Sequence, residues 1–257
     1  MAKIICVANQ KGGVGKTTTA VNLSASLAVA ERRVLLVDMD PQGNAGSGVG
    51  ADKELLEESI YDALIDDAPA ARIIQRTELP YLHLFPATSD LAGAELELVS
   101  VTDRERKLKR ILNSVSDSYD YIFIDCPPSL NLLTINAMTA ANSVLIPLQC
   151  EFYAMEGLSQ ILKTINLIQQ GLNSSLIIEG ILLTMFDARN NLSRQVGEEI
   201  RTHFAKETLQ TVIPRNVRLS EAPSHGKPIC LYDITSRGAT SYMDLAKEII
   251  GREVSHG

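Results

Sequence analysis

The sequence predicts an α/β fold with a single doubly wound, mostly parallel sheet and helices on both faces. Short runs rich in Ile, Val and Leu recur along the chain, and such near-continuous apolar runs are typical of strands buried on both faces. Segments with helical periodicity lie between them, and this alternation predicts a doubly wound sheet. The 257 residues show no internal repeat and no long linker, so we expect one domain over 1–257.

In chain order, the apolar runs predict strands over 4–8, 34–37, 81–85, 121–124, 143–147 and 176–183. The segments between and after them predict helices over 16–29, 54–66, 103–115, 130–140, 153–170, 192–204 and 239–250. The helix over 192–204 illustrates the pattern, since its apolar residues are spaced by four: Leu192, Val196, Ile200 and Phe204. Ligands of such sheets bind at the carboxyl ends of the strands, so the loops that follow the strands are candidate sites.

Composition excludes several classes of protein. The hydrophobic fraction of 45% and the charged fraction of 21% are ordinary for a globular protein. No apolar run reaches the roughly 18 residues of a membrane-spanning helix, and the apolar N-terminal stretch is too short for a signal peptide. The four cysteines are scattered without a C-x-x-C pair, which favours buried, reduced thiols in a cytoplasmic protein. The formal charge is −7, yet residues 185–257 hold ten basic and nine acidic side chains and can present a cationic face.

The first candidate site follows the first expected strand, where the chain reads Asn9-Gln10-Lys11-Gly12-Gly13-Val14-Gly15-Lys16-Thr17-Thr18 before a helix. The glycines allow the backbone N–H groups to converge on phosphate oxygens at a helix N-terminus. Lys16 is placed to neutralise the β- and γ-phosphates, and the Thr17 hydroxyl to bind Mg²⁺. The strict G-x-x-x-x-G-K-[ST] pattern is not met, because Gln10 occupies its first glycine position.

A second lysine, Lys11, stands early in this loop. A loop so short has limited room for two ammonium groups on one γ-phosphate, and Lys16 is the better placed of the two. Two interpretations of Lys11 therefore remain open. It can reach a nucleotide bound to a second subunit, or it can be a solvated surface lysine.

The strand expected over 34–37 delivers Asp38 and Asp40 to a loop. Alternate residues of an extended chain share a side, so both carboxylates can face one site. One could organise the Mg²⁺ shell while the other orients the attacking water, since phosphoryl transfer needs mostly positioning and charge neutralisation. The alternative is that both are turn aspartates before Pro41.

The strand expected over 121–124 is followed by Asp125. Four apolar residues before an aspartate are the Walker B pattern, whose acid holds Mg²⁺ directly or through water. The next residue, Cys126, is expected to be a buried small apolar residue, because no histidine is placed by the sequence to activate it.

Together these motifs resemble those of the ParA/Soj chromosome-partitioning ATPases, deviant Walker A proteins related to MinD and the nitrogenase iron protein. The resemblance extends over nearly the whole chain and includes 11–19, 34–44, 121–130, 147–157 and 212–228. It implies a P-loop ATPase that uses ATP and Mg²⁺ and forms an ATP-dependent homodimer. It also implies non-specific binding to double-stranded DNA, stimulation by a ParB-like centromere-binding protein, and a place in the cytoplasm at the nucleoid without membrane binding.

The resemblance implies a role for each matching residue of the nucleotide site. Lys11 corresponds to the signature lysine that crosses to the partner's nucleotide. Asp40 corresponds to the residue that activates or orients the hydrolytic water, and Asp125 to the Walker B acid; with Thr17 they are the expected metal ligands. Pro214 and Asn216 lie in the loop that packs on and reads the adenine. The expected phosphate contacts are Lys11, Gly12, Gly13, Val14, Gly15, Lys16, Thr17 and Thr18.

Two further segments gain roles from the resemblance. Arg189 and Arg218 correspond to arginines associated with DNA binding, and Glu151 lies in a segment near the dimer interface. Contacts to phosphates need cationic side chains without base readout, and Arg194, Arg201 and Arg215 lie in the same two segments as Arg189 and Arg218. They can equally be solvated surface arginines.

Three alternatives remain. A MinD-like membrane switch needs a basic amphipathic C-terminal helix, whereas residues 244–257 carry mixed charge and Gly251 is expected to end the last helix. An iron–sulfur reductase needs two cysteines placed to share a cluster, and the positions of Cys126 and Cys150 do not match. The third is a nucleotide sensor that binds partners without hydrolysing ATP, and the presence of Asp40 and Lys16 argues against it.

Overall fold

The computed structural model describes residues 1–254, and in this part of the chain eight strands form one sheet. The strand order is β3-β4-β2-β5-β1-β6-β7-β8, and all neighbours pair in parallel except β3 and β4. The strands are β1 (Lys3–Val7), β2 (Val34–Asp38), β3 (Gln75–Arg76), β4 (Leu82–Phe85), β5 (Tyr121–Asp125), β6 (Ser143–Gln149), β7 (Ile177–Phe186) and β8 (Thr208–Pro214). This confirms the predicted fold class.

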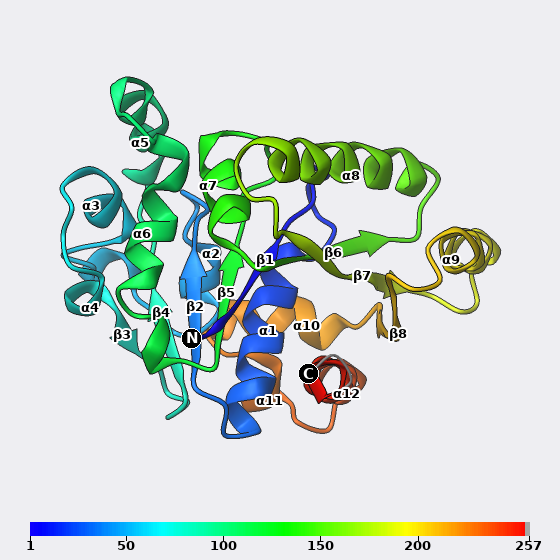
Figure 1. Cartoon of the computed structure of the whole chain (residues 1–257). Coiled ribbons are helices and arrows are strands. Elements are labelled where there is room, and N and C mark those ends of the chain that lie inside the picture. Colours follow the sequence, from blue (N-terminus) through cyan, green and yellow to red (C-terminus); the bar gives the residue numbers. More distant parts are fainter. Residues whose placement is uncertain (255–257) are drawn as a thin grey trace.

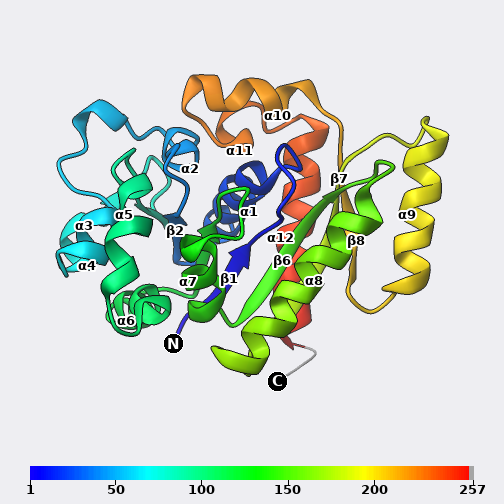
Figure 2. The same ribbon diagram turned by 90° about the horizontal axis from the view of Figure 1, so that it is seen from above.

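Helices cover both faces of the sheet (Figure 1). They are α1 (Lys16–Val29), α2 (Asn44–Ser47), α3 (Ile60–Ile65), α4 (Ala70–Ile73), α5 (Leu91–Glu97), α6 (Lys107–Asn113), α7 (Leu132–Ala140), α8 (Ala154–Gly171), α9 (Asn191–His203), α10 (Val217–Glu221), α11 (Ile229–Tyr232) and α12 (Arg237–Val254). Helices α1 and α12 pack on one face, and α7 and α8 on the other. Figures 1 and 2 place α3 to α6 at one end of the sheet and α9 at the other.

Several expected boundaries are wrong. The segment 54–66 is not one helix: a 3-10 turn over Lys53–Leu55 ends before α3 begins at Ile60. A capping box causes this start, because the Ser59 hydroxyl accepts from the backbone N–H of Tyr61 and the Asp62 carboxylate accepts from that of Ser59 at 2.7 Å. The segment 103–115 is likewise divided, and α6 covers only Lys107–Asn113.

Further differences concern two strands and the C-terminal third of the chain. The strand β8 and the edge strand β3 are absent from the predicted set. Leu192 is 41% exposed despite its helical spacing, because it lies in the first turn of α9, whereas Ile200 is buried. Helix α12 continues past Gly251 to Val254, so that glycine does not end it, and the expectations for 255–257 lie outside the described residues. None of the described helices has the length and apolarity needed to cross a bilayer.

The parallel register decides where the candidate residues meet. Asp125 at the end of β5 pairs with Asp38 at the end of β2 and with Val7 at the end of β1. The phosphate loop starts directly after β1, so the loop and both acidic strand ends share one edge of the sheet. All four cysteines are free and buried, as expected.

Candidate nucleotide-binding site

The loop between β1 and α1 has the backbone of an anion site. Gly13 and Gly15 have φ values of 73° and 88°, in the left-handed region that glycine tolerates best. Within residues 1–254, the backbone N–H groups of residues 12–18 donate to no other residue, whereas the N–H of Thr19 begins the α1 ladder by donating to the carbonyl of Gly15 at 2.9 Å. Free N–H groups at a helix N-terminus bind anions.

The two lysines of the loop have different surroundings. Lys16 is 7% exposed, and its Nζ donates to the backbone carbonyl of Lys11 at 3.1 Å. Burial lowers the pKa of Lys16, opposed by the negative charges of Asp125 and Asp40. The Lys11 ammonium instead forms an ion pair with Glu151 at 2.8 Å, and both side chains are partly exposed. Of the two lysines, only Lys16 therefore directs its ammonium group into the phosphate loop of its own chain.

A buried asparagine fixes the start of the loop. The Asn9 amide donates to the carbonyl of Pro147 at 2.8 Å, and its Oδ1 accepts from the backbone N–H of Lys11 at 3.0 Å. Pro147 belongs to β6, which neighbours β1, so the loop is anchored to the sheet on that side.

The structure separates the roles of the paired aspartates after β2. Asp38 is fully buried, and its carboxylate accepts from the backbone N–H groups of Asp40 at 3.1 Å and Gly46 at 3.0 Å. Burial raises the pKa of Asp38 to about 6, opposed by these hydrogen bonds. Asp40 is partly exposed and lines a cavity with Lys16 and Thr17. Asp38 therefore holds the loop, and Asp40 faces the cavity.

Asp125 is fully buried with little compensation for its charge. Neither carboxylate oxygen makes a hydrogen bond of normal geometry to any residue in the described part of the chain. Burial and the neighbouring Asp38 raise the pKa of Asp125 well above its usual range, opposed by the nearby Thr17 hydroxyl and the Lys16 ammonium. A buried carboxyl group without partners is costly unless a cation or a proton joins it.

Two adjoining cavities give the site its shape. The phosphate cavity has a volume of about 260 Å³ and is lined by Gly12, Gly13, Gly15, Lys16, Thr17, Thr18, Asp40, Pro128 and Met185. The adenine cavity, named for its proposed occupant, has a volume of about 320 Å³ and includes Thr184, Ile213, Pro214, Asn216 and Tyr242. The two share Gly15, Thr18 and Met185. The Oδ1 of Asn216 is buried and has no hydrogen-bond partner among residues 1–254, so it is free to contact a ligand.

Several lining residues of this site are absent from the predicted set, among them Thr184, Met185 and Tyr242. Thr184 and Met185 come from the end of β7, and Met185 has a φ of 47°, which is rare outside glycine. Tyr242 comes from α12, and its hydroxyl lies 3.2 Å from that of Thr19. Thr184 and Met185 directly follow the strand expected over 176–183, and the rule that ligands bind at strand ends would have indicated them. Tyr242 has no such signal.

The donor set fits a nucleotide with Mg²⁺. The free amides and Lys16 suit phosphate oxygens, and the unpartnered Asp125 carboxyl with the nearby Thr17 hydroxyl suits a hard cation. No cluster of three or more His, Cys, Asp and Glu side chains suited to a metal occurs in residues 1–254. Mg²⁺ would therefore depend on phosphate oxygens as well, which is its usual mode in such sites.

Known proteins share this sequence over almost its full length. A family model described as an AAA domain matches residues 2–178. The chromosome partitioning protein ParA of Myxococcus xanthus is 60% identical over 253 residues, covering 98% of this chain and 89% of that protein. The sporulation initiation inhibitor protein Soj of Bacillus subtilis is 62% identical over 249 residues, covering 97% of this chain and 98% of that protein. The chain belongs to the ParA/Soj family of chromosome-partitioning ATPases.

Solved structures share the fold of this ParA/Soj ATPase. The cobyrinic acid a,c-diamide synthase of Mycobacterium smegmatis, solved with ADP and magnesium, has a TM-score of 0.87 and 38% identity, covering 100% of this chain and 97% of that chain. The cell division ATPase MinD of Pyrococcus furiosus has a TM-score of 0.82 and 28% identity, covering 98% of this chain and 100% of that chain.

The two arginines expected to bind DNA lie outside the cavities of this ParA/Soj ATPase. Arg189 follows β7, and its 91% exposed side chain forms an ion pair with Asp187 at 3.0 Å. Arg218 lies on α10 and pairs with Glu221 at 2.9 Å and Asp233 at 3.4 Å. Both therefore carry intramolecular partners in this form of the chain.

Two of the buried cysteines of the ParA/Soj fold are in contact with each other. The Sγ of Cys126 lies 3.3 Å from that of Cys6, and contact with Cys6 together with burial raises the pKa of Cys126. Cys126 is 1% exposed, which confirms the expected buried small residue. Cys150 follows β6 and is 5% exposed.

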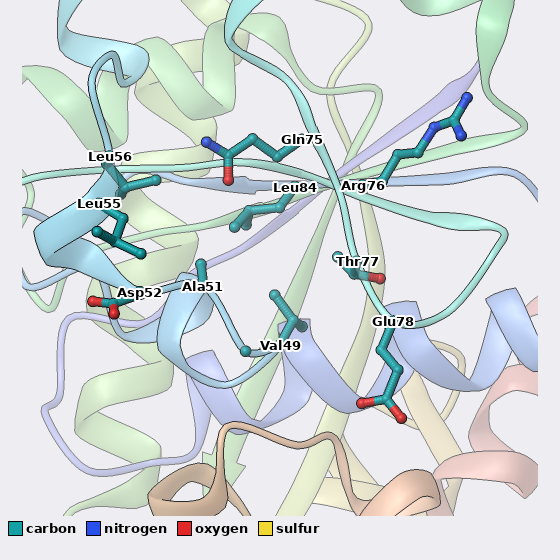
Figure 3. Close-up of a pocket in the computed structure, with 11 residues that line it drawn as sticks. Val49, Ala51, Asp52, Leu55, Leu56, Gln75, Arg76, Thr77, Glu78 and Leu84 are labelled. Carbon is teal, nitrogen blue, oxygen red and sulfur yellow. The ribbon is translucent and has the colours of Figure 1, made fainter.

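A separate cavity of about 400 Å³ lies between the chain after α2 and the edge strand β3 (Figure 3). Val49, Ala51, Leu56 and Leu84 contribute apolar side chains to it, and Asp52 and Glu78 contribute carboxylates. It shares no lining residue with the phosphate or adenine cavity.

Proposed function

We propose that this ParA/Soj ATPase is a switch that dimerises with ATP, binds double-stranded DNA non-specifically as a dimer, and is stimulated to hydrolyse ATP by a ParB-like centromere-binding protein. The observation that carries the proposal is the convergence of free loop amides, the Lys16 ammonium, Thr17 and Asp40 on one cavity, with the unpartnered Asp125 beside them. The site of action would be the cytoplasm, at the nucleoid.

Each group has a part in phosphoryl transfer. Lys16 and the amides of Gly12 to Thr18 bind the phosphates and neutralise their charge. Thr17, Asp125 and Asp40 would hold Mg²⁺, which when bound neutralises further charge on the phosphates. Asp40 orients the attacking water, since it is the carboxylate that lines the cavity while Asp38 is committed to backbone amides. Pro214 packs on the adenine, and the free Oδ1 of Asn216 accepts from its amino group.

The surroundings of Lys11 support ATP-dependent dimerisation. Lys11 points to Glu151 rather than to its own phosphate cavity, which leaves it available for the nucleotide of a second chain. The residues after Glu151, Phe152 and Tyr153, are 76% and 65% exposed. Their rings form an edge-to-face pair with 5.1 Å between the ring centroids. Exposed aromatic pairs of this kind are typical of surfaces that a partner covers. A second copy of the chain would bury them beside the shared nucleotides.

The positions of the arginines support a link between ATP and DNA. Arg189 lies four residues after Met185, and Arg218 lies two residues after Asn216, both lining residues of the adenine cavity. A nucleotide bound in that cavity would therefore contact the N-terminal part of each segment that carries one of these arginines. In a chain of formal charge −7, two such faces brought together would bind polyanions better than one.

One experiment tests the ATP site directly. Lys16→Ala should weaken ATP binding at least a hundredfold, because the phosphates lose their buried ammonium partner. Lys163→Ala, which removes an exposed lysine of α8, is the matched control and should bind ATP like the wild type. Calorimetry with Mg²⁺ measures both. Equal affinity in the two variants would contradict the assigned role of Lys16.

A second experiment tests the DNA surface. Arg189→Glu with Arg218→Glu should abolish the ATP-dependent DNA shift and leave the ATP dimer intact in sedimentation, because the contacts are to phosphates alone. The control is Arg72→Glu with Arg110→Glu, the same charge change on two exposed, ion-paired arginines of α4 and α6. Equal loss of DNA binding in both double variants would show a general charge effect.

Liposome flotation with ATP tests the alternative of a MinD-like membrane switch, which predicts that the protein floats with the vesicles.

A further inference from the structure

The phosphate loop is tied to β7 by a side-chain hydrogen bond. The Thr184 hydroxyl donates to the backbone carbonyl of Val14 at 2.8 Å, across a separation of 170 residues in sequence. Thr184 is 2% exposed and Val14 is 1% exposed, so water cannot replace this donor freely. The loop is therefore anchored on this side by Thr184, as Asn9 anchors it to β6.

This hydrogen bond determines the direction of one peptide plane. The peptides of the described chain are all trans, so the Val14 carbonyl and the Gly15 N–H point in opposite directions. With the carbonyl turned toward Thr184, the Gly15 N–H points away from β7, and it donates to no residue within 1–254. Gly15 lines both the phosphate and the adenine cavity.

Without a restraint, this plane would be easy to turn. Gly15 has a φ of 88°, and glycine adopts positive and negative φ about equally well. A turned plane would present the carbonyl oxygen to the phosphates and replace an attraction by a repulsion. The residue after Thr184 is also held firmly: Met185 keeps a left-handed φ of 47°, which persists only where the surroundings enforce it.

We propose that Thr184 is a positioning residue for ATP, whose hydroxyl holds the Val14–Gly15 peptide so that the Gly15 N–H is presented to a phosphate oxygen. The inference rests on the proposed binding of ATP in this cavity and adds a residue of β7 to the machinery that binds the phosphates. The Thr184 side chain also lines the adenine cavity, but its hydroxyl is bonded to Val14, so removing the hydroxyl alone should affect only ligands that carry phosphates.

The test compares ATP with adenosine. Thr184→Val keeps the shape of the side chain but removes the donor. It should raise the Kd for Mg·ATP about tenfold through the weakened amide–phosphate hydrogen bond. The Kd for adenosine should stay unchanged. Thr184→Ser keeps the hydroxyl and should restore most of the ATP affinity. Calorimetry, with competition measurements for the weaker ligand, gives both constants.

The matched control is Thr139→Val. Thr139 is fully buried and its hydroxyl has no partner among the described residues, so its loss should leave both constants unchanged. The ratio of the Kd for ATP to the Kd for adenosine remains informative even if Thr184→Val lowers the melting temperature. Wild-type ATP affinity in Thr184→Val, or an equal loss for adenosine, would overturn the positioning role. A wild-type chain that binds no ATP would instead overturn the proposed function and, with it, this inference.

Discussion

The carboxyl group of Asp125 lies out of water, next to Asp38 and without a hydrogen bond of normal geometry in the described chain. Its raised pKa means that the folded chain binds a proton more tightly there than the unfolded chain does. Asp38 behaves in the same way, with a pKa of about 6. Folded-state stability from these groups is therefore fully present below the ordinary carboxyl pKa near 4 and decreases as the pH rises through the raised values.

The variant Asp125→Asn tests this charge balance. It removes the ionisable group at nearly constant shape, so the free energy of unfolding without nucleotide or Mg²⁺ should rise by about 1–2 kcal/mol at pH 8, which corresponds to roughly 2–8 °C in Tm. The gain should shrink toward pH 5, and ATP hydrolysis should be lost at every pH. Thermal unfolding in a chelating buffer measures the effect, with the exposed Asp117→Asn as control. Parallel pH curves for wild type and Asp125→Asn would contradict the assigned burial cost.

The sequence predicted the residues that stand in continuous motifs and left the rest undecided. Lys16, Asp40 and Asp125 follow strands directly and could be placed at one edge of the sheet. The choice between Asp38 and Asp40 depends on the amide of Gly46, which reaches Asp38 only through the fold of α2. Tyr242 reaches the adenine cavity from the last helix, which no local pattern could indicate.

At the scale of elements, one strand that the sequence analysis missed is β8, whose place in the sheet depends on its packing against β7. The segment Thr208–Pro214 carries the exposed Gln210 and the partly buried Thr211 near its middle, so it lacks the continuous apolar run of the central strands. Its place at the sheet edge depends on Leu209, which is fully buried over Gly180 of β7. A Cβ on Gly180 would lie 2.7 Å from the Leu209 Cγ, so the close approach of these strands requires glycine.

Gly180→Ala should therefore destabilise the protein by about 1–3 kcal/mol, because the added methyl group overpacks a filled core. The control Gly157→Ala lies in α8 with nothing within 4 Å of the new Cβ and should stabilise by about 0.5–1 kcal/mol. Urea unfolding measures both. The cost of Gly180→Ala should fall in a Leu209→Val background, since the two residues contact each other. An unchanged cost in that background would show that strain elsewhere is responsible.

At the scale of the whole molecule, the sequence predicted the alternation of strands and helices but not their order in space. The position of β1 between β5 and β6 follows from long-range pairing, and that order brings the phosphate loop beside Asp125 and beside Glu151. The surface around the loop then combines an exposed glycine, a paired lysine and two exposed aromatic rings. A single chain leaves this surface uncovered, and the proposed switch requires a second chain to cover it.

The variant Gly12→Val distinguishes the folding and ATP binding of the single chain from the formation of the dimer. A Cβ on Gly12 meets nothing within 4 Å, and its φ is not in the left-handed region, so the monomer should fold with an unchanged Tm and bind ATP within a few-fold of wild type. The branched side chain would project from the exposed loop where a second chain must approach. Sedimentation with ATP should accordingly show monomers, and the ATP-dependent DNA shift should be lost. Gly13→Val is the informative control, because its φ of 73° strains the loop itself and should weaken ATP binding in the single chain. An ATP-dependent dimer of Gly12→Val would show that the two chains meet elsewhere.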